Sequence, residues 1–138
     1  MRILAVDPGE KHFGIAISDP TGTIATPLTV IQHVSRLADA ASIANLAVQY
    51  QAGLIVIGIS FDEEGLQTRQ SRRAVRLAES IHNQCDIPLM MWDESFSTQI
   101  ARQAYIKMGT TRRKRQGHLD EFAATVILQS YLDSNVTQ

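Results

Sequence analysis

Residues 54–59 (LIVIGI) form a run without a polar side chain, and four of the six residues are β-branched. Such a run is typical of a parallel strand that helices cover on both faces of a sheet. Turn residues and an amphipathic helical pattern follow it, so strand and helix alternate here. The pattern predicts an α/β domain with 54–59 as its central strand.

The segments before this run predict antiparallel strands. Residues 2–6 are mostly apolar and end at Asp-Pro-Gly, and residues 13–18 alternate small and apolar side chains before a second turn. A β-branched stretch follows at 23–34, in which Pro27 indicates an edge strand or a bulge. Three strands joined as hairpins are therefore predicted.

Helical spacing dominates the later chain. Ser35 is a typical N-cap for a helix that reaches Gly53, and residues 67–84 predict a helix with one apolar face and one arginine-rich face. The remaining predicted elements are a strand at 88–92, a helix that begins at Ser97, a basic polar loop at 110–117 and a last helix over 118–132. No linker divides the chain, so residues 1–138 are predicted to form a single domain.

Composition excludes several classes of protein. No apolar run approaches the roughly 20 residues of a spanning helix, and the N-terminal run lacks a signal cleavage site. The single Cys85 can form neither an internal disulfide nor a thiolate zinc cluster, and is expected to be a buried packing residue. A cytoplasmic protein with no membrane partner is expected.

Carboxylates fall where the predicted strands end. Asp7 closes the first strand, Asp93 and Glu94 close the fifth, and Asp120 opens the last helix. The carboxyl ends of parallel strands form the crevice in which α/β proteins bind ligands, so these acids are expected at one mouth. Asp120 shares a helical face with Ala123, Ala124, Ile127 and Tyr131.

Grouped carboxylates require cations, because burying each without a partner costs several kcal/mol. Oxygen ligands favour Mg²⁺ or Mn²⁺, and a pair of such ions roughly 4 Å apart can assist hydrolysis of a phosphodiester. Each acid alone also has a structural interpretation: Asp7 in a turn, Asp93 as a cap, and Asp120 in a first helical turn. Their convergence is less easily explained by structural roles alone, so a metal-dependent nuclease stands beside the structural interpretation.

A basic run lies just before the last predicted helix and consists of Arg112, Arg113, Lys114 and Arg115. Such a run is usually a solvated charge cluster. Beside Asp120, it is expected to contact a nucleic-acid backbone with an affinity that falls as salt rises. Trp92 is interpreted as a core residue at a strand end.

Four blocks carry a family resemblance: DPGEKHFGIAISD (7–19), LIVIGISFDEEG (54–65), WDESFST (92–98) and HLDEFAATVILQSYL (118–132). Together they resemble the YqgF/RuvX family, bacterial proteins that are similar to Holliday junction resolvases and regarded as nucleases of the precursor 16S rRNA 5′ end. The resemblance covers essentially the whole chain. It implies a ribonuclease H-like α/β fold, a mixed five-stranded sheet of three antiparallel strands and then parallel crossovers, flanked by helices.

The resemblance also implies residue roles. Asp7, Glu94 and Asp120 match the catalytic, metal-binding acids, and Asp93 is the nearest substitute ligand. Lys11 matches a basic position that would contact phosphate.

Several positions depart from the family pattern. His12 stands where arginine is usual, so its contact with nucleic acid is expected to be weaker. Ser60 replaces a proline, and Ser95 replaces an arginine beside the acids. Gly117 stands where junction resolvases have a second aspartate, which argues against junction cleavage.

The leading hypothesis is a Mg²⁺- or Mn²⁺-dependent nuclease that acts on precursor 16S rRNA in ribosome biogenesis. The alternatives are a non-catalytic nucleic-acid-binding factor in transcription or ribosome maturation and, third, a Holliday junction resolvase. ATP binding as in sugar kinases and actin is disfavoured, because those proteins enclose ATP between two such domains. The expected partner is precursor rRNA or another structured nucleic acid. A homodimer is compatible with the sequence, by analogy with resolvases, although no heptad pattern requires one.

Overall fold

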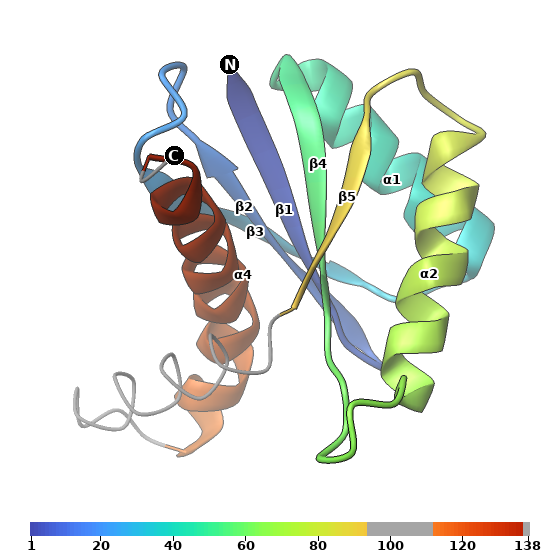
Figure 1. Cartoon of the computed structure of the whole chain (residues 1–138). Coiled ribbons are helices and arrows are strands. Elements are labelled where there is room, and N and C mark those ends of the chain that lie inside the picture. The colour runs from blue at the N-terminus through green and yellow to red at the C-terminus, as the bar shows by residue number, and fades with distance from the viewer. Residues whose placement is uncertain (94–111, 137–138) are drawn as a thin grey trace.

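The computed structural model describes residues 1–93 and 112–136, with side chains in the last helix described for 122–134. The strands form one sheet in the order β3-β2-β1-β4-β5. They are β1 (Arg2–Pro8), β2 (His12–Ser18), β3 (Ala25–Gln32), β4 (Ala52–Ile59) and β5 (Leu89–Asp93). The helices in the described ranges are α1 (Arg36–Gln49), α2 (Arg69–His82) and α4 (Arg112–Val136). Figure 1 shows α1 and α2 on one face of the sheet and α4 on the other.

The topology confirms the predicted order of hairpins and then crossovers. Strands β1, β2 and β3 pair antiparallel, whereas β4 pairs parallel to both β1 and β5. The prediction that residues 54–59 form the central strand is wrong, because β1 occupies the centre. The chain leaves β3, crosses through α1 and returns beside β1, so β1 lies between β2 and β4. Strand β4 is still an interior strand, as its apolar sequence requires.

Both interpretations of Pro27 are confirmed. Strand β3 lies at the edge of the sheet, and its register with β2 shifts where Ile15 pairs with Thr29 but Ala16 pairs with Pro27. Leu28 is the extra residue of this bulge. Proline has no N–H to donate to a ladder, so a bulged edge strand accommodates it at low cost.

Alternation along β1 divides the core into two layers. Leu4 and Val6 pack against α1 and α2, whereas Ile3 and Ala5 pack against α4. The side chains of a strand point alternately to opposite faces, so odd-numbered residues of β1 face α4. This parity determines on which face each residue near the end of β1 lies.

The predicted start of α1 at Ser35 is confirmed, whereas α2 begins at Arg69, two residues after its predicted start. The predicted end of the first helix at Gly53 is wrong, because α1 ends at Gln49, Gln51 has a left-handed backbone and β4 begins at Ala52. The Ser35 hydroxyl accepts a hydrogen bond from the Ala38 N–H at 3.1 Å, and Thr68 caps α2 in the same way. The apolar face of α2 is buried, and three of its four arginines are exposed. Cys85 is only partly buried, although it packs against the core as predicted.

The predicted basic loop at 110–117 is wrong for residues 112–117, because α4 begins at Arg112. Arginine, lysine and glutamine are good helix formers, so a basic run without proline does not interrupt a helix. The predicted helix that begins at Ser97 lies outside the described residues. Among the described helices, none is long and apolar enough to cross a lipid bilayer.

Candidate active site

Asp7 lies near the carboxyl end of β1 on the face that α4 covers. Like Ile3 and Ala5, it is an odd-numbered residue of β1, so its side chain points to the same face of the sheet, and it is half-buried. Its partner on β2 is Gly14. On the other side Val6 pairs with Ile57 of β4, and the residue after Ile57 is Gly58.

Two glycines therefore flank Asp7 in the sheet. No side chain from β2 or β4 occupies the α4 face beside the carboxylate, since Gly14 and Gly58 have none. The half-buried carboxylate of Asp7 supplies the oxygen donor that Mg²⁺ and Mn²⁺ prefer. The local structure thus fits the divalent cation that the acids were predicted to bind.

Asp120 lies inside α4, eight residues after Arg112. The structural interpretation of Asp120 as a first-turn residue is therefore wrong, because the helix begins earlier than predicted. The four residues predicted to share its helical face are all buried: Ala123, Ala124, Ile127 and Tyr131. The side chain of Asp120 itself is outside the described part.

Helix α4 runs so that its N-terminal half lies at the end of the sheet where β1 and β4 finish (Figure 1). Its C-terminal half is fixed at the opposite end. There the Gln129 amide accepts from the Ala25 N–H at 2.9 Å and donates to the Thr23 carbonyl at 3.0 Å. Asp7 and the helical turn of Asp120 therefore lie at the same end of the molecule.

Asp93 ends β5 and pairs with Ile59. Alternate residues of a strand point to the same face, so Asp93 lies on the face of Leu89 and Met91, which pack on the α1 and α2 side. This is the opposite face from Asp7. Glu94 lies outside the described residues.

Trp92 is partly buried and packs against the core at the end of β5, as predicted. It packs on the α4 face, where its ring meets Tyr131 edge to face with centroids 5.4 Å apart. Among the described side chains, no three of His, Cys, Asp and Glu lie close enough to hold a metal ion.

The turn between β1 and β2 carries Lys11 and His12, and both are exposed. The Gly9 N–H donates to the His12 carbonyl at 3.0 Å, and a Cβ on Gly9 would lie 2.5 Å from that oxygen. The turn therefore requires glycine at this position. It holds the exposed residues Lys11 and His12 a few residues beyond Asp7.

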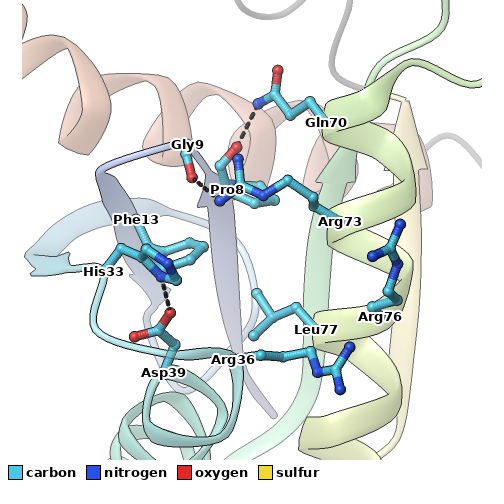
Figure 2. A pocket seen from close by; sticks show the side chains of 10 residues that line it. All are labelled: Pro8, Gly9, Phe13, His33, Arg36, Asp39, Gln70, Arg73, Arg76 and Leu77. Atoms are coloured by element: carbon cyan, nitrogen blue, oxygen red, sulfur yellow. Dashed lines mark hydrogen bonds and ion pairs between the residues drawn. The ribbon is translucent and has the colours of Figure 1, made fainter.

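Two α2 residues that the sequence did not indicate hold this turn. The Gln70 amide donates to the Pro8 carbonyl, and Arg73 donates to the Gly9 carbonyl at 3.4 Å (Figure 2). Arg73 also donates to the Glu10 carbonyl at 3.5 Å. They lie more than 60 residues away in the chain. No local spacing could have predicted these contacts.

Ser60, where the family has proline, belongs to a hydroxyl cluster that joins β4 to α2. Its N–H donates to the Ser71 hydroxyl at 3.1 Å, and that hydroxyl donates to the Ser60 carbonyl. Thr68 caps α2 within the same cluster. The contacts fix the loop after β4 against the start of α2.

The basic residues 112–115 occupy the first turn of α4, and their side chains are not described.

The sheet order and the acid at the end of its first strand define a ribonuclease H-like α/β domain. Solved structures share this fold over 99% of the chain: Thermus thermophilus RuvC with a Holliday junction, at a TM-score of 0.61 and 14% identity, and the fowlpox virus resolvase with its junction DNA, at 0.60 and 15%. They are covered over 96% and 99% of their own lengths.

The chain belongs to the RuvX family, because the family model, described as Holliday junction resolvase, matches residues 1–134. A relative from Thermoanaerobacter pseudethanolicus is 38% identical over 135 residues, which is 97% of both chains. One from Syntrophus aciditrophicus is 39% identical over 134 residues, 97% of this chain and 89% of that one. Both are named "Putative pre-16S rRNA nuclease".

Proposed function

We propose that this chain is a divalent-metal-dependent nuclease that processes the 5′ end of precursor 16S rRNA. Two relatives of nearly equal length carry that name, and the fold is that of nucleases and resolvases. The observation that carries the proposal is the half-buried carboxylate of Asp7 between two glycines, at the strand end where α/β proteins bind ligands.

Asp7, Glu94 and Asp120 are the proposed ligands of Mg²⁺ or Mn²⁺. When bound, such a cation would lower the pKa of a water and stabilise charge on the departing oxygen. The carboxylates would position the cation, and the glycines beside Asp7 would let the scissile phosphate approach the sheet. Asp93 is not proposed as a ligand, because its parity places it on the other face.

Lys11, His12 and the basic first turn of α4 are the proposed contacts to the nucleic-acid backbone. Their positions in the fold support this role, since the β1–β2 turn and the start of α4 both lie at the end of the sheet where β1 and β4 finish. Precursor rRNA is the proposed partner, and the cytoplasm is the proposed location.

The test compares cleavage of an RNA that carries the 5′ precursor segment with cleavage of duplex DNA and of a four-way DNA junction. Each substrate is incubated with Mn²⁺, Mg²⁺ or EDTA. Asp120→Asn should reduce RNA cleavage by about 10²-fold or more, because it removes a metal ligand. Asp133→Asn is the control, since Asp133 is an exposed acid near the other end of the same helix.

Cleavage of the junction in preference to RNA would overturn the rRNA proposal and favour a resolvase. Salt-sensitive RNA binding without cleavage in any metal would overturn the nuclease and favour a non-catalytic binding factor.

A further inference from the structure

A pocket of about 170 Å³ opens on the face of the sheet opposite to the candidate active site. Figure 2 shows its walls, which come from the β1–β2 turn, from the start of α1 and from α2. A protein cavity of about 150 Å³ accommodates benzene. The pocket therefore has room for one ring-sized group.

Three arginines line this pocket: Arg36 from α1, and Arg73 and Arg76 from α2. Within the described part of the chain, no carboxylate lies within 4.0 Å of any of their side chains. Guanidinium groups match the geometry of phosphate and can bind it with two parallel hydrogen bonds. An anion would supply the negative charge that the described residues do not.

Asp39 is the one acid that lines the pocket, and its charge is directed elsewhere. Its side chain is 2% exposed, with one carboxylate oxygen 2.5 Å from His33 Nδ1 and the other accepting from the Val34 N–H at 3.0 Å. This contact fixes the imidazole edge-on to Phe13, with centroids 6.0 Å apart. Asp39 thus orients His33 and does not pair with the arginines.

The floor of the pocket is apolar. Pro8, Phe13 and Leu77 line it and are themselves buried. A base or sugar ring can rest on such a floor while its phosphate meets the cationic rim. The combination of apolar floor and arginine rim is the chemistry that a phosphorylated ring requires.

We propose that this pocket binds one nucleotide unit, with its ring on Phe13 and Leu77 and its phosphate on Arg36 and Arg76. Pro8 and Gly9 line the pocket and directly follow Asp7, so a strand that passes over the end of β1 can reach both faces. The source of the unit is therefore a strand of the substrate, a point that rests on the proposed function. A free nucleotide offers the same chemistry and is distinguished by the test.

The test is an NMR titration of the full chain in EDTA, with AMP in one arm and a short single-stranded RNA in the other. The backbone signals of Phe13, His33 and Leu77 report on the pocket. A double variant, Arg36→Gln with Arg76→Gln, removes two rim charges. The control double variant, Arg69→Gln with Arg72→Gln, removes two exposed α2 charges that do not line the pocket.

RNA is expected to shift the pocket signals of the wild type. The rim variant should bind RNA about tenfold more weakly, because two cationic groups are missing. Its plot of log affinity against log salt concentration should be less steep by about 1–2. The control should lose less than about threefold. Shifts with AMP as well would support the pocket and assign it to free nucleotides. The proposal is overturned if neither probe shifts these signals, or if both double variants lose affinity equally. If RNA shifts the NMR signals of the pocket residues but is not cleaved with any metal, the proposed nuclease activity is refuted and the proposed nucleotide binding is supported.

Discussion

At the scale of single residues, Asp19 shows how one carboxylate holds a turn. One of its oxygens accepts from the N–H groups of Thr23 at 2.8 Å and Ile24 at 2.9 Å, and the other accepts from Thr21. These hydrogen bonds, that from Ile24 foremost, hold the pKa of the Asp19 carboxyl well below its usual range. The charged form is thus favoured in the folded state.

Asp19→Asn should therefore lower the melting temperature at neutral pH. Because the folded-state pKa is depressed, the stabilisation is fully present above the unfolded value of about 3.9 and is lost as the pH falls below it. The difference in melting temperature between wild type and variant should shrink between about pH 4 and pH 2. A difference that stays constant from neutral to acid pH would contradict the hydrogen-bonding explanation.

Gly9 is the residue on which the β1–β2 turn depends. In Gly9→Ala the new methyl group would lie 2.5 Å from the His12 carbonyl oxygen, so the turn must open. Urea unfolding should show a loss of about 1–3 kcal/mol, the usual cost of overpacking. Glu10→Ala, an exposed neighbour in the same turn, is the control and should change stability by less than about 0.5 kcal/mol.

At the scale of elements, the hydroxyl cluster joins β4 to α2. Ser71 is fully buried, and its hydroxyl both accepts from the Ser60 N–H and donates to the Ser60 carbonyl. Ser71→Ala should cost about 1–3 kcal/mol, because it removes the partner of the partly buried Ser60 N–H and carbonyl. Ser80→Ala provides a comparison on the same helix, since Ser80 is also buried but makes no side-chain hydrogen bond in the described part. Equal unfolding free energies for the two variants would contradict this role.

The elements also show what the sequence could and could not predict. Period-two and helical spacing predicted the strands, the start of α1 and the apolar face of α2, because burial of one face leaves a local pattern. The centre of the sheet could not be predicted from 54–59, since strand order depends on where a crossover returns. The start of α4 was misjudged because a basic run was interpreted as a loop, although its residues favour helix.

For the candidate site too, the sequence predicted what depends on local spacing and missed what depends on contacts between distant segments. Asp7 and the helical face of Asp120 follow from local spacing. The side of the sheet on which Asp93 lies depends on the register of β5, and the clamps from Gln70 and Arg73 depend on contacts between distant segments. Neither leaves a local signal.

At the scale of the whole molecule, the sheet separates two chemistries. The α4 face carries the acid of β1 beside two glycines, and the α1 and α2 face carries an arginine-rimmed pocket. The end of β1 is common to both, and α2 holds the turn that connects them. We therefore propose that cleavage occurs on the α4 face and that the α1 and α2 face contacts the nucleic-acid strand.

The measurement that tests the central claim most directly is Mn²⁺-dependent cleavage of precursor RNA by Asp7→Asn and Asp93→Asn side by side. Both remove one carboxylate at the same end of the sheet, but on opposite faces. Asp7→Asn should lose at least about 10²-fold in rate while its melting temperature stays close to wild type, and Asp93→Asn should retain activity. Full activity in Asp7→Asn, or equal losses in the two variants, would contradict an active site on the α4 face.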